Sequence, residues 1–296
     1  MTFATDLKLP EGPVALPDGS FLVVEGGRGC VTQISPDGQS KRIIAITGEP
    51  NGLAVDKTGA IWVADTRPPA LIRLTMDGKF ERVLVDCNGE AFLFPNDLCF
   101  GPDGALYLTD SGIFTDDFAP GGVVRPDWMD LRLDGRLYKV DIRTLAIEKL
   151  DAGFQFINGI AFSADHYLYV NETITGMVYR YRWKDGKIVG PRKGFGNVHD
   201  PSKASAFKGP DGMAFDVNGR LYVAVYAQGD VTVLGKDGEV IERIPTPGNL
   251  PTNLCFGLPG RKKIYVTEYE LGHLECFEVD ADGLPLWISA RLAGDD

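Results

Sequence analysis

The sequence of 296 residues contains 30 Lys and Arg against 41 Asp and Glu, which gives a net charge of −11. Such an acidic chain is a poor partner for nucleic acid, because phosphate backbones are bound by clustered basic side chains. Hydrophobic residues make up 44%, as in soluble globular proteins, and no apolar run approaches the roughly 18 residues that a membrane span needs.

The start of the chain leaves no room for a signal peptide, because only ten residues, Asp6 and Lys8 among them, precede the first motif. We therefore expect a cytoplasmic protein. The five cysteines are an odd number without a CxxC pair, which does not suit a disulfide framework or a zinc knuckle. Cys99 and Cys255 lie in apolar strand-like runs and are expected to be buried free thiols.

One pattern recurs six times along the chain: a polar residue, a short apolar run, a turn and an apolar-aromatic run. Its clearest copies are PNGLAVDKTGAIWVADT, PNDLCFGPDGALYLTDS, INGIAFSADHYLYVNET and PDGMAFDVNGRLYVAVY, at residues 50–66, 95–111, 157–173 and 210–226. The first and last copies are EGPVALPDGSFLVVE at 11–25 and TNLCFGLPGRKKIYVTEY at 252–269. Two apolar runs around a turn predict a β-hairpin in each copy.

A second hairpin follows each copy, because an Asp-Gly pair stands between the next two strand-like runs and glycine accepts positive φ without steric cost. These pairs are at residues 37–38, 77–78, 134–135, 185–186, 237–238 and 282–283. Two hairpins make a four-stranded antiparallel unit, and six units of about 49 residues account for the chain. The sequence therefore predicts an all-β fold, a six-bladed β-propeller that forms one domain over residues 1–296. Either terminus could supply an outer strand that closes the ring.

Two stretches between repeats are longer than the others. One runs from Ser111 to Arg136, and the other runs roughly from Lys193 to Gly209. Long loops of this kind often act as lids, so each is a candidate cover for one face of the propeller. A plain surface excursion is the alternative.

The polar residue that opens each copy defines a ring, since equivalent positions of six blades surround the central axis and the innermost strand is expected to follow this residue. The six positions are Glu11, Asn51, Asn96, Asn158, Asp211 and Asn253. Local turns would explain Asn51 and Asn253, but they explain neither Glu11 nor six polar residues around one axis. Carboxylate and amide oxygens without His or Cys predict a site for a hard divalent cation, with Ca²⁺ preferred over zinc.

A second set of acids lies about fourteen residues after the ring positions. It comprises Glu25, Asp65, Asp110, Glu172 and Glu268, and Val225 interrupts it. These acids either bind loop amides or polarise the ring residues from behind. Asp97 follows Asn96 where most copies have glycine, and its carboxylate could contact substrate, metal-bound water or a local amide.

The chain resembles the SMP-30/gluconolactonase/LRE-like family over essentially its whole length. The motifs that carry the resemblance are Glu11-Gly12-Pro13, Pro95-Asn96-Asp97, Asn158-Gly159 and Pro210-Asp211-Gly212. The family includes calcium-dependent sugar lactonases, Drp35-type lactonases, luciferin-regenerating enzymes and, more distantly, diisopropylfluorophosphatase. The resemblance implies that Glu11, Asn158 and Asp211 ligate the metal. It also implies that Asn96 ligates the metal or contacts substrate, and that Asp211 doubles as base or nucleophile.

One departure from the family concerns the first motif, where many sugar lactonases have Trp and this chain has Val14-Ala15. Part of the pocket wall or core therefore differs, and the resemblance does not specify the substrate.

We predict a metal-dependent hydrolase that opens a lactone, in the first instance a sugar lactone. One divalent ion, Ca²⁺ in preference to Fe²⁺, Mn²⁺ or Zn²⁺, would polarise the carbonyl of the lactone. The proposed ligands of this ion are Glu11, Asn96, Asn158 and Asp211. Asp211 would activate water, and Asn96 and Asp97 would contact this small-molecule substrate. The alternatives are hydrolysis of a phosphotriester or another ester at the same site, or a non-catalytic metal-binding propeller. Neither nucleic acid nor membrane is an expected partner.

Overall fold

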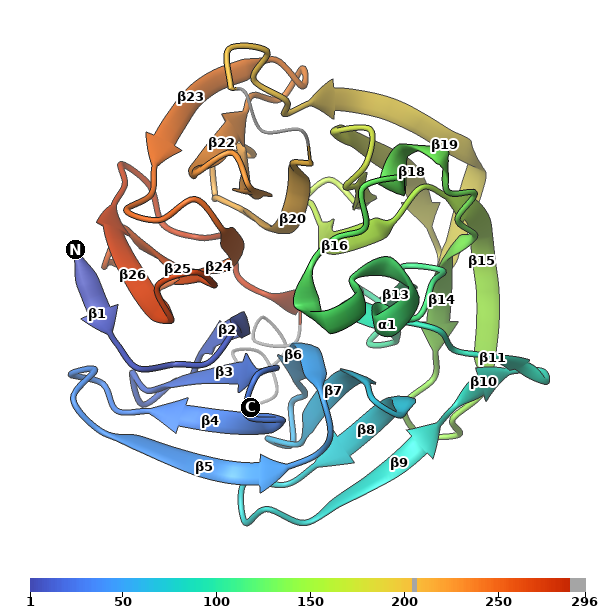
Figure 1. The fold of residues 1–296 in the computed structure, drawn as a ribbon, viewed down its shortest axis with the longest axis horizontal. Helices are drawn as coiled ribbons and strands as arrows, with labels where there is room; N and C mark the ends of the chain where they lie inside the picture. The colour runs from blue at the N-terminus through green and yellow to red at the C-terminus, as the bar shows by residue number, and fades with distance from the viewer. Residues whose placement is uncertain (204–206, 288–296) are drawn as a thin grey trace.

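The computed structural model describes residues 1–203 and 207–287. Six four-stranded antiparallel sheets stand around a central axis as the blades of a propeller (Figure 1). The predicted all-β fold, with six blades of four strands, is confirmed.

The strands run from the axis outward in each blade. Blade 1 contains β2 (Pro10–Ala15), β3 (Phe21–Glu25), β4 (Cys30–Ile34) and β5 (Lys41–Ile46). Blade 2 contains β6 (Pro50–Val55), β7 (Ile61–Thr66), β8 (Pro69–Leu74) and β9 (Phe80–Leu84). Blade 3 contains β12 (Pro95–Phe100), β13 (Leu106–Asp110), β14 (Gly135–Val140) and β15 (Ile147–Phe154).

The second half of the chain repeats this arrangement. Blade 4 contains β16 (Ile157–Phe162), β17 (Tyr167–Glu172), β18 (Met177–Lys184) and β19 (Lys187–Asn197). Blade 5 contains β20 (Gly209–Phe215), β21 (Leu221–Tyr226), β22 (Asp230–Leu234) and β23 (Val240–Pro245). Blade 6 contains β24 (Pro251–Phe256), β25 (Lys263–Glu268), β26 (His273–Glu278) and β1 (Thr2–Ala4). A small hairpin of β10 (Asp86–Cys87) and β11 (Glu90–Ala91) precedes β12.

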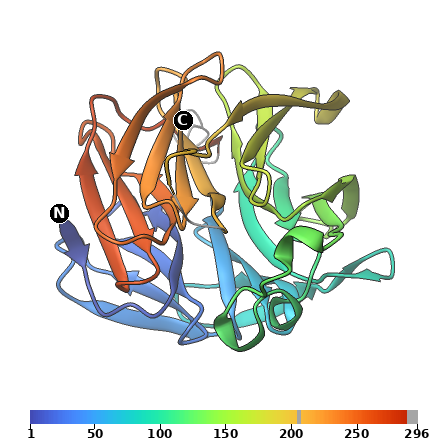
Figure 2. The same cartoon turned by 45° about the horizontal axis from the view of Figure 1, so that its top comes forward.

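The N-terminal strand closes the ring, which answers the question that the sequence left open. β1 lies antiparallel to β26 as the outermost strand of blade 6, with Thr2 opposite Glu275 and Ala4 opposite Leu274 (Figures 1 and 2). The Thr2 hydroxyl donates a hydrogen bond to Glu275 Oε1 at 3.0 Å. Blade 6 therefore joins three strands from one end of the chain to one strand from the other end.

The hydrophobic core is divided among the contacts between neighbouring blades. Six apolar clusters of buried residues lie one at each interface, and the second strands β3 and β13 are buried along their whole length. Trp62 of blade 2, for example, belongs to one cluster with Tyr138 of blade 3, and its indole N–H donates to Asp56 Oδ2 at 2.9 Å. The repeated aromatic residue is therefore retained because it fills the interface with the next blade.

Three sequence expectations need correction. The ring residues lie inside the inner strands, at the second position or, for Asp211, at the third, and do not precede them. The second insertion starts after β19, at Val198 and not near Lys193, because β19 pairs with β18 as far as Asn197. Cys99 and Cys255 are half-buried and not fully buried, although all five cysteines are free thiols. None of the helices within residues 1–203 and 207–287 has the length and hydropathy to span a bilayer.

Candidate metal centre

Each inner strand has a register shift close to its start. In blade 2 the pairing shifts between Pro50 and Gly52, and in blade 3 it shifts between Pro95 and Leu98. A bulge of this kind leaves a residue out of the ladder and re-aims its side chain. Because neighbouring inner strands contact one another around the axis, the re-aimed residues form a ring at one mouth of the channel. Its members are Asn51, Asn96, Asn158, Asp211 and Thr252, which are left out of the ladder, and Glu11, which pairs with Val24 immediately before the shift.

The sixth member is Thr252, and the prediction of Asn253 is wrong by one residue. In β24 the shift falls between Pro251 and Asn253, so Thr252 is the residue left out of the ladder. Asn253 takes the place of Asp97. The main-chain N–H of each donates a hydrogen bond of 3.0 Å to a threonine hydroxyl, of Thr267 and Thr109 respectively. Blades 3 and 6, which face each other across the axis, thus carry a polar side chain where the other four blades carry glycine.

The glycines beside the ring are required by close contact between inner strands. A Cβ on Gly159 would lie 2.2 Å from the carbonyl oxygen of Asp211, and a Cβ on Gly212 would lie 1.9 Å from Asn253 Cγ. Real Cβ atoms do not approach other atoms so closely. Backbone packing and the Asn253 side chain together fill the space below the ring.

Gly212→Ala should therefore lower the free energy of unfolding by about 1–3 kcal/mol, because the new methyl group must displace Asn253 or the backbone. Urea denaturation measures this loss. Gly26→Ala is the matched control, since its Cβ would find no atom nearer than 3.7 Å, and its stability should stay close to that of the wild type. Equal stability of the two variants would contradict the crowded channel.

Three buried carboxylates approach one another at the ring. Glu11, Asp97 and Asp211 are each less than a tenth exposed. Burial raises the pKa of Asp97 to about 6. Burial also raises the pKa of Glu11 and of Asp211 well above the usual range, and the nearby Asp97 charge raises both further. Like charges held together in a low dielectric favour protonation, or a bound cation that compensates them.

Amide oxygens complete this charge cluster. Asn158 Oδ1 is buried and has no hydrogen-bond partner, although buried polar atoms normally have one. Asn96 is 1% exposed, and its Oδ1 accepts a hydrogen bond from Asn51 Nδ2 at 3.0 Å. Among residues 1–203 and 207–287, no group of three His, Cys, Asp or Glu side chains is placed to hold a metal ion by itself, so an ion here needs the amides. Carboxylates with an orphaned amide oxygen fit a hard divalent cation such as Ca²⁺.

The second set of acids binds loop amides, which was one of its two predicted roles. Asp110 accepts hydrogen bonds from the N–H groups of Leu93 and Phe94 at 2.8 and 3.0 Å. Glu172 accepts from Gln155 N at 2.6 Å. Glu25, Asp65 and Glu268 bind the amides of Lys8, Glu49 and Leu250 in the same way. Each acid thereby fixes the segment that leads into the inner strand of its own blade.

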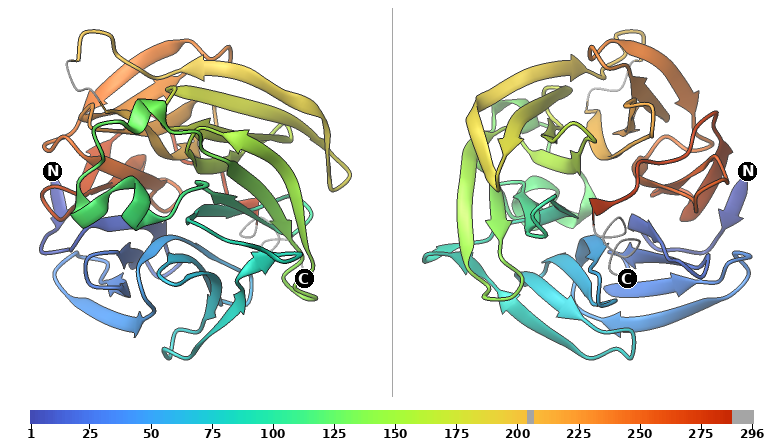
Figure 3. Two further views of the ribbon diagram at one scale, coloured as in Figure 1. Left: turned by 45° about the vertical axis from the view of Figure 1, so that its right-hand side comes forward. Right: turned by 180° about the vertical axis from the view of Figure 1, so that it is seen from behind.

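Both insertions lie at the ring side of the propeller and contact each other. The first carries α1 (Thr115–Phe118) and the 3₁₀ turns η1 (Pro120–Gly122) and η2 (Trp128–Asp130), and Figure 3 shows it (green) extending over one face. Phe118 packs against Phe156, two residues before Asn158, with ring centroids 4.5 Å apart. Phe118 and Trp128 both contact Phe207 of the second insertion, at 5.6 and 5.2 Å.

Two tyrosines at the mouth escaped the sequence analysis. Tyr226 is the last residue of β21 and Tyr269 directly follows β25, and their rings are 6.3 Å apart. Burial raises the pKa of Tyr226 to about 12, and the Asp211 charge adds to this rise. The signal was present in the sequence, because the residue that follows the second strand is Ser111 in blade 3 and Thr173 in blade 4. A residue with a polar group therefore recurs one position after the second set of acids.

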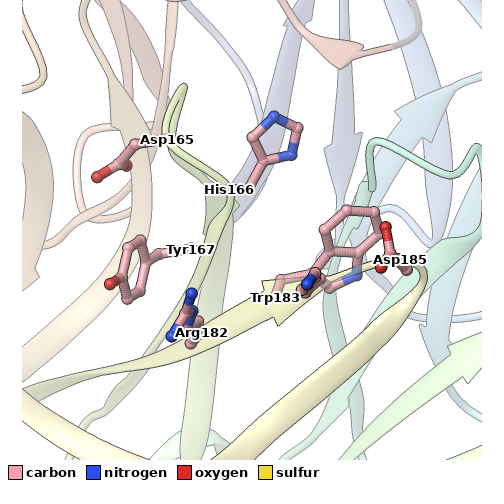
Figure 4. Close-up of a pocket in the computed structure, with 7 residues that line it drawn as sticks. Asp165, His166, Tyr167, Arg182, Trp183 and Asp185 are labelled. Carbon is pink, nitrogen blue, oxygen red and sulfur yellow. The ribbon is translucent and has the colours of Figure 1, made fainter.

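The pocket drawn in Figure 4 lies away from the ring. It measures about 410 Å³ and is lined by Asp165, His166 and Trp183, among others. These residues belong to the turn after β16 and to the far end of β18, whereas the ring residue Asn158 stands near the start of β16. The pocket is therefore at the opposite end of the blade from the candidate metal centre.

Known proteins resemble this chain in both sequence and fold. The model of the protein family described as "SMP-30/Gluconolactonase/LRE-like region" matches residues 9–270. A gluconolactonase of Zymomonas mobilis is 28% identical over 289 residues, which cover 87% of this chain and 76% of that protein. A diisopropyl-fluorophosphatase of Loligo vulgaris is 29% identical over 303 residues, which cover 94% and 91%. The structure of the calcium-binding protein regucalcin of Agrobacterium tumefaciens is similar in fold, with a TM-score of 0.75, 20% identity and coverage of 96% and 95%.

Proposed function

The chain belongs to the SMP-30/gluconolactonase/LRE-like family, and on that premise we propose that it is a metal-dependent hydrolase that opens the ring of a lactone, a sugar lactone in the first instance. The observation that supports the proposal most is the buried, unpartnered Asn158 Oδ1 beside the Glu11 and Asp211 carboxylates. A scaffold without a ligand in its channel would gain nothing from leaving such an atom unsatisfied.

The proposed ligands are Glu11, Asn96, Asn158 and Asp211. A bound divalent cation would supply Lewis-acid stabilisation of the negative charge that develops on the carbonyl oxygen of the ester. We favour Ca²⁺, because all the donors are oxygen atoms and the similarly folded regucalcin is a calcium-binding protein.

Asp211 is the proposed general base. Its carboxylate would take a proton from the water whose oxygen attacks the carbonyl carbon, and would pass that proton to the ring oxygen as the carbon–oxygen bond breaks. Asn96 would hold the substrate by its amide. Asp97 is the second proposed substrate contact, and its Oδ1 is already fixed by the Leu98 N–H at 2.8 Å.

The aromatic insertions would cover the bound lactone and exclude water from it. Phe118→Ala removes a ring that joins the two insertions, and it should raise KM by about 5- to 30-fold, which corresponds to about 1–2 kcal/mol of apolar contact. Steady-state kinetics on the lactone that turns over fastest gives KM. Phe114→Ala is the control, because Phe114 lies in the same insertion but is 44% exposed. An unchanged KM in Phe118→Ala would contradict the lid.

Acid release from a panel of aldonolactones and simple γ- and δ-lactones tests the proposal. The chain is first stripped of metal, and Ca²⁺, Mn²⁺, Fe²⁺ or Zn²⁺ is then added back. Metal-dependent turnover of a lactone is the expected result. Turnover of phosphotriesters alone would favour the second candidate, which the similarity to diisopropyl-fluorophosphatase supports. Ion binding without any turnover would indicate a non-catalytic propeller.

A further inference from the structure

We propose that Ser111, Thr173 and Asn253, which are not ligands themselves, fix the orientation of three proposed ligands and thereby set the affinity for the cation. The inference rests on the function proposed above and deepens it. Each of the three is a positioning residue: it hydrogen-bonds to an atom of a ligand side chain other than the oxygen proposed to bind the ion.

Thr173 orients Asn158. Its hydroxyl oxygen lies 2.8 Å from the carbonyl oxygen of Pro210 and 3.3 Å from Asn158 Nδ2. A hydroxyl has one proton, and a carbonyl oxygen only accepts, so Thr173 donates to Pro210 and must accept from the Asn158 amide. The amide nitrogen is therefore the end held by Thr173. The oxygen, which is buried without a partner, is the end left for the ion.

Ser111 orients Asn96 by the same chemistry. Its hydroxyl donates to the carbonyl oxygen of Ile157 at 2.9 Å, and it therefore accepts from Asn96 Nδ2, also at 2.9 Å. Asn96 Oδ1 is then the end that reaches Asn51 Nδ2 in the ring. In both cases the hydroxyl donates to a main-chain carbonyl oxygen at the start of the next blade. One side chain therefore both contacts the next blade and orients the ligand.

Asn253 orients Glu11. Asn253 Oδ1 accepts a hydrogen bond from Leu254 N at 2.8 Å, which turns Nδ2 toward Glu11 Oε2 at 3.0 Å. Glu11 Oε2 also accepts from Gly12 N. The two donors occupy this oxygen and leave Oε1 for the ion. Asn253 also binds Asp97 and lowers its pKa, so one amide serves two of the three carboxylates.

All three positioning side chains are buried, and each has a main-chain partner that settles which end acts as donor. Residues that orient metal ligands in this way typically change metal affinity by about 10- to 100-fold when they are replaced. Substitution of a positioning residue should therefore weaken ion binding while every proposed ligand remains present.

The experiment compares Thr173→Val with Thr173→Ser in the full, metal-stripped chain. Isothermal titration with Ca²⁺ gives Kd, and urea denaturation without Ca²⁺ gives the free energy of unfolding. Thr173→Val keeps the shape but has no hydroxyl, and its Kd should rise by about 10- to 100-fold. Thr173→Ser keeps the hydroxyl and should restore the Kd to within about threefold of the wild type. Ser111→Ala should weaken binding in the same way and serves if Thr173→Val does not fold.

Thr66→Val is the matched control, because Thr66 stands at the equivalent position of blade 2. It is also buried, but its hydroxyl donates to the carbonyl oxygen of Glu49 at 2.9 Å. Thr66→Val should lose stability and keep the wild-type Kd. Wild-type affinity in Thr173→Val, or equal weakening in Thr66→Val, would overturn the positioning role. A wild-type chain that binds none of the four ions would instead overturn the proposed function itself.

Discussion

The Asp211→Asn variant should lose turnover by a factor on the order of 10²–10⁴, the range that a positioned general base contributes. The amide keeps an oxygen for the ion but has no basic site for the proton of water. The fold should persist, and without metal the variant should be at least as stable as the wild type, because one of three mutually repelling buried carboxylates is removed. Lactone turnover with saturating Ca²⁺ and urea denaturation without it measure the two effects.

Glu275→Gln is a suitable control for this experiment. Glu275 is a fully buried carboxylate, but it lies on β26 beside the Thr2 hydroxyl and away from the ring. Its replacement alters a buried charge without altering the proposed base, so turnover should remain near that of the wild type. Full activity in folded Asp211→Asn would refute the assignment of the base, whereas inactivity of both variants would point to a general loss of structure.

Removal of the cation should destabilise the protein, and the effect should depend on pH. The pKa values of Glu11, Asp97 and Asp211 are raised in the folded state, so the folded state binds more protons than the unfolded state. The stability linked to this difference is fully present below the unfolded pKa, near 4, and is lost as pH rises through the folded pKa, about 6 for Asp97. The metal-free chain should therefore lose stability between pH 5 and pH 7.5, as far as these three groups are concerned.

A bound cation compensates the same charges, so Ca²⁺ should stabilise the protein more at pH 7.5 than at pH 5. At a thousand times Kd, binding contributes about 4 kcal/mol, which for a chain of this length corresponds to a rise in Tm of about 6 °C. Calorimetry at both pH values, with and without Ca²⁺, measures this difference. Asn158→Ala, which lacks one proposed ligand, should show a much smaller rise. An equal rise at both pH values would contradict the charge cluster.

The fold could be predicted from the sequence because two physical requirements recur from blade to blade. Trp62 or its equivalent must fill the interface with the next blade, and an Asp-Gly turn must reverse the chain. The ring could be predicted as a set, since Glu11, Asn96, Asn158 and Asp211 stand at the same distance before the turn of their own repeats, and the structure brings these side chains to one mouth of the channel. Their roles as ligands and base remain predictions.

Other features depend on pairing across strands, which spacing alone does not reveal. Thr252 was missed because β24 and β25 are joined by a turn of different length, which moves the spacing by one residue and makes Asn253 appear to be in frame. Ser111 and Thr173 were missed because their partners lie on the next blade, at Ile157 and Pro210. Such hydrogen bonds join residues of different repeats, and the spacing within one repeat does not reveal them.

The seam of the ring has a consequence for synthesis. Glu11 belongs to blade 1 and Asn253 to blade 6, and their side chains are joined across 242 residues. The same seam carries β1 on β26, which links positions 273 residues apart. At about 5–20 residues per second, a ribosome needs about 12 to 50 s to pass from Glu11 to its partner. Until then the ring cannot close, so the proposed cation would bind the complete site only late in synthesis.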